Sequence, residues 1–487
     1  MDFSALLFGI NYIMPIFIYN SLTRKKDPLP DPAQQPEVKM YVCGPTVYDE
    51  PHIGHARSAY IFDVVRRYLI YRGYKVTFVR NVTDVDDKII DKARNEHKGE
   101  DLNTSFKKVA DKYLAAYHEA LDSLGIAATK PEVIEPKASE YIGKMIDFIK
   151  MLIEKGAAYP AGGDVYFDIT KAKNYGKLSG QSLEKMDSGA RVAPLENKKN
   201  PLDFALWKSA KVGEPSWDSP FGKGRPGWHI ECSVMSSDIL GREFDIHGGG
   251  LDLIFPHHEN EIAQSEGAGN KFAKIWMHHG LLTINGQKMS KSLGNFVTVK
   301  DFLAKYKYAA LLKLFNLSAH YSHPIDYSDD KIREAREALE RILILQERID
   351  RQLSAISYQL SVKKVGEIED IKKKFTEAMD DDFNTPQALA CVFELVTLAN
   401  KNIDDLNFIY SAKNTLEELL GILGVSLKAG QATTITDEEI KTEILKREKA
   451  RQERNFGLSD KIRKELEEKS IILEDTKDGK TTWRRKL

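Results

Sequence analysis

Apolar residues in the first part of the chain follow strand and helix periods in turn. An apolar run typical of a buried strand ends near Cys43, and a Gly44-Pro45 turn follows it. Between residues 52 and 71, apolar side chains recur every three or four positions, which predicts a helix ended by Gly73. Residues 75–80 have the pattern of a second strand. These segments predict a βαβ unit of a nucleotide-binding α/β sheet, whose ligands lie at the carboxyl ends of the strands.

The same patterns predict that another fold interrupts this sheet. Helical spacing covers residues 102–124 and 138–155, and Gly162-Gly163 separates two strand-like runs as in a hairpin. These features predict an α+β insertion. The strand pattern then resumes at residues 242–246 and 271–277, with a helical stretch between them.

The second half of the chain has a different character. Strand patterns end after about residue 288, and from about residue 329 the apolar spacing is helical, which predicts a helical bundle. Residues 441–466 form a charged helical stretch, and a short hairpin follows it. The predicted fold class is therefore α/β, with a Rossmann-type parallel-sheet domain that carries an α+β insertion. A helical bundle and a small C-terminal α+β domain follow.

Composition narrows the class of protein. A length of 487 residues predicts roughly three domains, and 42% hydrophobic with 29% charged residues is typical of a soluble protein. The net charge of -1 gives no overall attraction to nucleic acid, so any RNA contact has to come from local basic patches. Three widely separated cysteines are no disulfide framework and are typical of a reducing cytosol. The first twenty residues are apolar but lack the basic start of a signal peptide. We therefore expect a cytoplasmic protein without a membrane segment.

The stretch YVCGPTVYDEPHIGH at residues 41–55 joins the first strand to the first helix. His52 and His55 lie three residues apart on the first helical turn, where free backbone N–H groups and the helix dipole favour an anion. Gly54 leaves room for a ligand to approach. Two imidazoles in this place can donate hydrogen bonds to phosphate oxygens. The tetrapeptide alone has an equally good alternative, in which both histidines only decorate a helix start.

Two further motifs suit a nucleotide. In KMSKS at residues 288–292, Lys288 and Lys291 lie on a glycine-bounded loop that can close over a triphosphate. In HGGGLD at residues 247–252, a predicted strand-to-helix turn, three glycines let the backbone approach a flat ligand and Asp252 can accept hydrogen bonds from a ribose. Taken alone, the two lysines could equally belong to a solvated surface loop. The glycine run could equally be an ordinary tight turn.

Four scattered residues offer donor atoms that suit a tetrahedral metal. His257 and Glu261 are four residues apart at the start of a predicted helix and therefore share a face. Cys43 and Cys232 add two sulfurs, and zinc accepts this mixture of ligands. The spacing is not diagnostic, and the residues alone favour two cysteines buried as hydrophobic side chains. His258 and Glu259 are expected on a different face of this helix, and the choice of ligands stays open by one residue. Cys391, in an apolar helical run, is predicted to be a core residue.

HIGH and KMSKS are the two ATP signatures of class I aminoacyl-tRNA synthetases, and CGPTVYD at residues 43–49 resembles the cysteine-specific branch, the cysteinyl-tRNA synthetases. The resemblance extends from about residue 14 to residue 483, with the motifs in the family's order. The domains that it implies are 14–125 and 216–295 for the two halves of the Rossmann catalytic domain, 126–215 for a connective insertion, 296–328 for a stem-contact linker, 329–428 for a helical bundle that binds tRNA and its anticodon, and 436–487 for a small anticodon-binding domain.

The resemblance also implies a reaction. ATP with Mg²⁺ and L-cysteine form cysteinyl-adenylate, and the cysteinyl group passes to the 3′-terminal ribose of tRNA(Cys). One zinc ion per chain would select the substrate thiolate, because the hydroxyl of serine is a poorer ligand. The site residues implied are His52, His55, Lys288 and Lys291 for catalysis; Gly54, Gly248, Gly249, Gly250, Asp252 and Lys291 for ATP; Thr83 and Trp228 for the amino acid; and Cys43, Cys232, His257 and Glu261 for zinc.

Two rival interpretations fit parts of the sequence. A ligase with the same core that passes the cysteinyl group to a small amine generally lacks the C-terminal tail present here. A tRNA-binding or structural zinc protein without activity would not need the histidine pair and the two lysines. In the tail, Trp483 fits equally well as a platform for a base and as part of a small core. Phe221 and Asn455 depart from the family pattern. We expect the protein to be a monomer.

Overall fold

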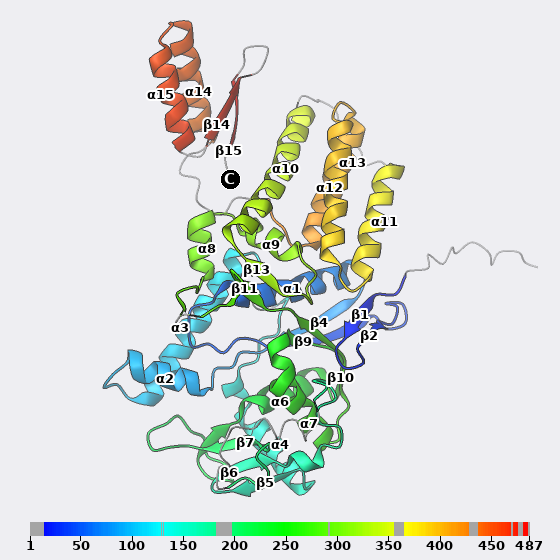
Figure 1. Cartoon of the computed structure of the whole chain (residues 1–487), viewed down its shortest axis with the longest axis vertical. Helices are drawn as coiled ribbons and strands as arrows, with labels where there is room; N and C mark the ends of the chain where they lie inside the picture. Colours follow the sequence, from blue (N-terminus) through cyan, green and yellow to red (C-terminus); the bar gives the residue numbers. More distant parts are fainter. Residues whose placement is uncertain are drawn as a thin grey trace, which may run out of the picture.

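The computed structural model describes residues 14–127, 129, 131–181, 197–290, 293–354, 365–427, 437–468, 471–475 and 481–485. Lys291 lies outside these described residues. Figure 1 shows the inserted sheet at one end of the molecule, a central parallel sheet next to it, and the helices of the C-terminal half at the other end.

Four parallel strands form the central sheet in the order β10-β9-β3-β4. The chain runs from β3 through α1 to β4 on one side and from β9 through α7 to β10 on the other. The strand order therefore reverses between β3 and β9, and such a switch point opens a crevice at the carboxyl ends of the strands. The bounds are Glu37–Val42 for β3, Ile53–Tyr71 for α1, Lys75–Arg80 for β4, Glu243–Gly250 for β9, Glu259–Gly267 for α7 and Phe272–His279 for β10.

Both faces of the central sheet are buried, which explains why its strands are apolar at most positions. Met40 and Val42 pack with α1 on one face, whereas Tyr41 packs on the other face with α6 (Trp228–Leu240). The predicted βαβ unit is confirmed. A hairpin of β1 (Phe17–Asn20) and β2 (Lys25–Pro28) lies beside β10.

The insertion contains a four-stranded antiparallel sheet in the order β5-β6-β7-β8. The predicted hairpin is confirmed: β5 pairs with β6 around Gly162 and Gly163, whose φ angles of 62° and 89° favour glycine. Two helices precede this sheet after β4, and a third packs within the insertion. The bounds are Asp87–Glu96 for α2, Leu102–Ser123 for α3, Ile142–Glu154 for α4, Ala158–Ala161 for β5, Asp164–Phe167 for β6, Phe204–Ser209 for β7 and Gly224–Pro226 for β8, with short 3-10 turns at Ala138–Tyr141 and Ile169–Lys171.

A small sheet in the order β12-β11-β13 connects the catalytic half to the helical half. Its strands are β11 (Leu282–Ile284), β12 (Gln287–Lys288) and β13 (Ile325–Tyr327). The expectation that strands end near residue 288 is therefore wrong, because β13 returns to pair in parallel with β11. A three-residue strand carries too little alternation to be seen in the sequence.

The predicted helical bundle is confirmed. Its long first helix buries one stripe of apolar residues, Leu339, Ile342, Leu345 and Ile349 among them. These residues belong to the same core as α1 and the face of the central sheet that α1 covers. The helices are α8 (Val299–Tyr306), α9 (Ala309–Leu317), α10 (Asp329–Ser354), α11 (Gly366–Asp380), α12 (Thr385–Lys401) and α13 (Leu406–Ile422).

The C-terminal unit is α+β, as expected, but its charged stretch is two helices rather than one. The chain turns between α14 (Asp437–Gln452) and α15 (Phe456–Glu468), where Arg454 has a φ of 55°. A hairpin of β14 (Ile471–Asp475) and β15 (Thr481–Arg485) follows. Trp483 is partly buried against the small apolar core of this unit, in keeping with the second of its two interpretations.

Arg447 fastens this hairpin to α14, and we expect Arg447→Ala to loosen it. Its guanidinium, 3% exposed, donates to both carboxylate oxygens of Asp475 at 2.9 and 3.0 Å. Loss of this paired hydrogen bond should destabilise the unit by about 1–3 kcal/mol, measured as faster hydrogen exchange of residues 471–475. Exposed Lys446→Ala is the control. Unchanged exchange in Arg447→Ala would contradict this role.

The same pair makes the stability of the unit depend on pH. Arg447 holds the pKa of Asp475 below its ordinary value, so the pair stabilises the unit fully above a pH of about 4 and less as the pH falls further.

Among the residues that the structure describes, no helix is both long enough and apolar enough to cross a membrane.

Candidate active site and metal centre

The N-terminus of α1 is capped by the imidazole of His52. Its Nδ1 accepts hydrogen bonds from the backbone N–H groups of Gly54 (3.1 Å) and His55 (3.2 Å), and Nδ1 of His55 accepts one from the His52 N–H (3.3 Å). The Ile53 N–H donates to the Val297 carbonyl at 3.1 Å. The first amides of the helix are thus already bound. The prediction that free helix N–H groups hold an anion here is wrong, and the side chains have to do so.

Those side chains are two neutral hydrogen-bond donors. The His52 and His55 rings stack with centroids 3.7 Å apart. Because each Nδ1 accepts a hydrogen bond, each neutral ring carries its proton on Nε2. Burial, together with the neighbouring His52, lowers the pKa of His55 to about 3, so this ring is uncharged at neutral pH. The pair therefore offers directed N–H groups rather than positive charge.

A cleft of about 430 Å³ opens beside these histidines at the carboxyl end of β3. The start of α1 and the β11–β12 hairpin face each other across it: a Cβ on Gly54 would lie only 3.4 Å from Cε of Met289. Eight of the residues expected at the site line the cleft, namely Cys43, His52, Gly54, His55, Trp228, Gly250, Asp252 and Lys288.

The glycine run lies inside β9 and not in a turn after it, which corrects the sequence-based expectation. A Cβ on Gly248 would lie 2.3 Å from the Phe62 ring, and one on Gly249 would lie 2.7 Å from the His258 ring. These two glycines therefore give room to neighbouring side chains of the protein. Gly250, at the end of the strand, lines the cleft together with Asp252.

Behind the cleft the four residues expected to bind zinc converge from three segments. The donor atoms of Cys43, Cys232, His257 and Glu261 all lie within 4.8 Å of one another. The two sulfurs are 3.7 Å apart, and Nε2 of His257 is 3.0 Å from Oε1 of Glu261. Cys43 follows β3 at the switch point, where its N–H bonds to the Gly248 carbonyl of β9 at 3.1 Å. The strand order thus explains why residues so distant in sequence meet.

A second set of donors overlaps the first; in it His258 is the one-residue alternative to His257 that the sequence left open, whereas His247 was not expected as a ligand. His247 and His258 join Cys43 and Glu261 in a group that also lies within 4.8 Å. Nε2 of His258 is 3.3 Å from Sγ of Cys43, and Nε2 of His247 is 2.8 Å from Oε2 of Glu261. The sequence signal for His247 was its place at the end of a strand, and for His258 its place next to His257. Only the tertiary fold brings both rings to Cys43 and Glu261.

The buried cluster holds opposite charges that stabilise one another. Burial opposes ionisation of Glu261, but His247 and His257 lower the pKa of this carboxyl to about 2. Burial likewise disfavours a charged His257, yet Glu261 raises the pKa of this imidazole to about 10. Burial and the proximity of Cys232 raise the pKa of Cys43 well above its ordinary value. Against burial, hydrogen bonding from Cys43 lowers the pKa of Cys232 to about 6. A metal cation would replace the protons that hold this cluster together.

The two residues expected to contact the amino acid lie in different environments. Trp228 lines the cleft, is 39% exposed and stacks on the His257 ring with centroids 4.1 Å apart. Thr83 is buried, pairs with Thr46 behind the cleft wall and donates its hydroxyl to Oε2 of Glu231 at 2.7 Å. The structure therefore brings Trp228, but not the Thr83 side chain, to the cleft surface.

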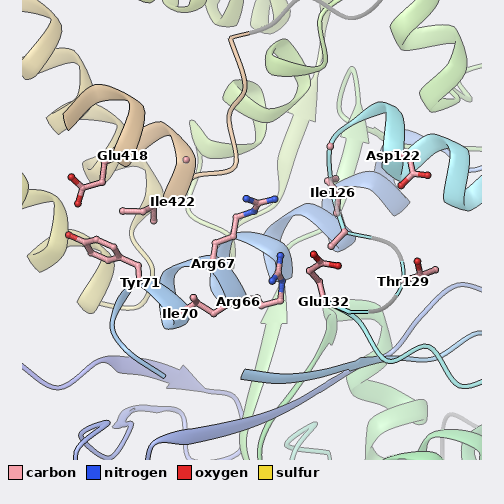
Figure 2. A pocket seen from close by; sticks show the side chains of 13 residues that line it. Arg66, Arg67, Ile70, Tyr71, Asp122, Ile126, Thr129, Glu132, Glu418 and Ile422 are labelled. Carbon is pink, nitrogen blue, oxygen red and sulfur yellow. The ribbon is translucent and has the colours of Figure 1, made fainter. Parts of the chain in front are cut away.

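A larger cavity of about 770 Å³ lies at the opposite end of α1 and includes none of the expected site residues (Figure 2). Arg66 and Arg67 of α1 form part of its lining, and both pair with the buried carboxylate of Asp63. Figure 2 shows Glu418 and Ile422 of α13 on one side and Asp122, from the end of α3, on the other. Size alone would thus direct attention away from the histidines and thiols.

The fold and the cleft together define a class of enzyme. Residues 30–337 match the family described as tRNA synthetases class I (C) catalytic domain, and residues 374–428 match the DALR domain. The chain is therefore a class I aminoacyl-tRNA synthetase, with its histidine pair at the start of the first crossover helix.

More particularly, it belongs to the cysteine–tRNA ligase family. It is 47% identical over 476 residues to the curated cysteine–tRNA ligase of Clostridioides difficile, which covers 96% of this chain and 99% of that one. The corresponding enzyme of Fusobacterium nucleatum is 49% identical over 486 residues, with the same shares of both chains covered.

Solved structures share the fold at low identity. Mycobacterium tuberculosis methionyl-tRNA synthetase in complex with methionyl-adenylate has a TM-score of 0.57 at 15% identity, over 80% of this chain and 90% of that one. A structure described as a putative arginyl-tRNA synthetase from Campylobacter jejuni has a TM-score of 0.52 at 14% identity, over 80% and 93%. The predicted fold class is thereby confirmed.

Proposed function

We propose that this cysteine–tRNA ligase activates L-cysteine with ATP to cysteinyl-adenylate, transfers it to the 3′-terminal ribose of tRNA(Cys), and selects the amino acid through a zinc ion. The role of zinc is supported by the convergence of two thiols, an imidazole and a carboxylate next to the cleft of about 430 Å³. Membership of the family supports tRNA(Cys), cysteine and ATP with Mg²⁺ as substrates.

The donor set fits zinc by its chemistry. Two sulfurs, one nitrogen and one oxygen in a buried site match the ligands of tetrahedral zinc sites in proteins. Glu261 is ionised already, and Cys232 gives up its proton more readily than an ordinary thiol. A zinc ion held there supplies a centre that binds a thiol as its thiolate and a serine hydroxyl only poorly. Trp228, stacked on His257 at the cleft surface, would form the wall beside the amino acid's side chain.

The histidine pair and the lysines serve the phosphates. When the cysteine carboxylate attacks the α-phosphate, negative charge develops on phosphate oxygens and on the departing pyrophosphate. The Nε2–H groups of His52 and His55 are held in place by the bonds to each Nδ1, so they need no reorganisation as this charge forms. Lys288 in the cleft, with Lys291 on the same loop, adds positive charge. Gly54 and Gly250, which line the cleft, leave room for ATP, and Asp252 accepts hydrogen bonds from its ribose. Gly248 and Gly249 act indirectly, because they make room for the side chains of Phe62 and His258 behind the cleft.

The remaining parts of the chain suit the tRNA. The linker expected at residues 296–328 would contact the tRNA stem, and the helical bundle at residues 329–428 and the small unit at residues 436–487 would bind its anticodon region. Residues 126–215 are the connective insertion between the two halves of the parallel-sheet domain. Thr83 acts from behind the cleft wall through Glu231 rather than at its surface. We further propose that the enzyme works as a cytoplasmic monomer.

The test is ATP-dependent attachment of labelled cysteine to purified tRNA(Cys), with serine in parallel and the metal content measured on the same sample. Charging with cysteine and not serine, by protein that contains about one zinc per chain, is the expected result. Adenylate formation without tRNA charging would instead favour transfer to a small amine. Full cysteine selectivity in metal-free protein would contradict the role of zinc.

A further inference from the structure

A buried arginine follows the histidine pair on α1. Arg57 comes two residues after His55, and its side chain is 1% exposed. The guanidinium donates four hydrogen bonds, and none of the acceptors is a carboxylate. They are the carbonyls of Gly280 (3.1 Å from Nε), Tyr321 (3.2 Å from Nη2) and His323 (2.9 Å from Nη2), and Oδ1 of Asn316 (3.1 Å from Nη1).

Burying a charged arginine without a carboxylate partner costs desolvation free energy. Burial lowers its pKa to about 10, so it keeps its charge at neutral pH while facing only neutral acceptors. Its planar fork reaches acceptors from three segments at once, which a single ammonium group does not do. The Arg57 guanidinium is therefore placed where it joins three segments of the chain, although its burial there costs free energy.

Three of the four acceptors, the backbone carbonyls, belong to the support of the β11–β12 hairpin, and the fourth, Asn316, lies on α9. Gly280 lies between β10 and β11, and Tyr321 and His323 lie just before β13, the partner of β11. The segments touch so closely that a Cβ on Gly280 would lie 2.1 Å from the backbone carbon of His323. The Gly280 N–H also bonds to the Tyr321 carbonyl at 2.9 Å. Arg57 thus ties to α1 the small sheet on which Lys288 stands.

The chain that follows the β11–β12 hairpin also bonds to the start of α1. The Val297 carbonyl accepts from the Ile53 N–H at 3.1 Å, and the Val299 N–H donates to the Pro51 carbonyl at 3.0 Å. The chain is therefore held against the helix start that carries the histidine pair at Gly280, before the hairpin, and again at Val297, after it. At Gly280 the hydrogen bonds come from the Arg57 side chain. At Val297 they join backbone groups, and the rings of His52 and Phe296 also meet edge to face with centroids 5.2 Å apart.

We propose that Arg57 is a positioning residue for adenylate formation: its guanidinium fixes the β11–β12 hairpin so that Lys288 and the histidine pair face the same phosphates. The inference rests on the proposed function. Group transfer between two anions depends on placement, and a displacement of about 1 Å costs on the order of 10²-fold in rate. Cysteine binding involves Cys43, Cys232 and Trp228, and none of the four hydrogen bonds of Arg57 reaches these residues, so cysteine binding should be spared.

The test is cysteine-dependent exchange between ATP and labelled pyrophosphate by Arg57→Lys, which keeps the charge but loses the fork. We expect kcat to fall about 10–100-fold, KM for cysteine to stay within about twofold, and KM for ATP to rise. Asn316→Ala, which removes one acceptor, should show the same pattern with a loss of about 3–10-fold and covers the case in which Arg57→Lys folds poorly.

Tyr60→Phe is the matched control. The Tyr60 hydroxyl, also on α1 and buried, donates to the Leu423 carbonyl at 2.6 Å and fastens α1 to the helical bundle instead. We expect it to lower the melting temperature while leaving kcat unchanged. Two results would overturn this inference alone. One is an equal kcat in the wild type, Arg57→Lys and Asn316→Ala. The other is a loss of kcat that follows the fall in melting temperature across these two variants and Tyr60→Phe. A wild-type enzyme without cysteine-dependent exchange would overturn the proposed function itself.

Discussion

His52→Asn should slow cysteine activation by about 10²–10³-fold while leaving the protein as stable as the wild type. The amide oxygen of asparagine occupies the place of Nδ1 and is a good N-cap, so the bonds from the N–H groups of Gly54 and His55 are kept. What disappears is the Nε2–H donor to the phosphate oxygens. The measurement is kcat for ATP–pyrophosphate exchange, together with the melting temperature.

His52→Gln reverses the two effects and serves as the control. Its longer amide places a donor near the position of Nε2 but no acceptor at the place of Nδ1. We expect it to retain more activity than His52→Asn and to lose about 1 kcal/mol of stability with the cap. If His52→Asn were fully active, or if the loss of activity followed the loss of the cap, the phosphate role of the histidine pair would be contradicted.

This separation of roles was beyond the sequence. The spacing of His52 and His55 predicts a helix start facing a ligand, and the helix is there. A tetrapeptide does not reveal that one imidazole closes the helix end, because capping depends on the φ and ψ angles of His52 and on Val297, more than 200 residues away. The sequence therefore predicts that the histidine pair lies at a helix start, but not that the first amides of this helix are already bound.

The metal cluster shows the same limit. His257 and Glu261 share a face because helical spacing places them so, and a motif resemblance was needed to add the two cysteines. His258 was expected on a different face from His257, yet its Nε2 lies 3.3 Å from the sulfur of Cys43, 215 residues away. The reason is local: residues 254–258 form a wide π-type turn that starts before α7, so the regular helical periodicity used for the prediction does not apply there. Likewise, β13 was missed because its pairing with β11 is set by tertiary contacts.

Cys232→Ala should abolish both zinc retention and much of the preference for cysteine. Removing a ligand should weaken zinc binding by at least about 10²-fold, since even neighbours of ligands are worth 10–100-fold. Cys391→Ala makes the same substitution as a control, because Cys391 is also buried (8% exposed, against 2% for Cys232) but packs in the helical bundle on α12. We expect it to keep about one zinc per chain and normal activation.

Selectivity gives a second readout for the same pair of variants. Without the metal, a cavity of fixed shape distinguishes a thiol from a hydroxyl by size and polarity alone, and such discrimination is limited to about 10²-fold. The ratio of kcat/KM for cysteine to that for serine should therefore fall at least about tenfold in Cys232→Ala and remain unchanged in Cys391→Ala. Retention of a full complement of zinc and of the wild-type ratio in Cys232→Ala would mean that the overlapping donors, His247 and His258, form the working site instead, because these are the residues that complete the alternative set around Cys43 and Glu261.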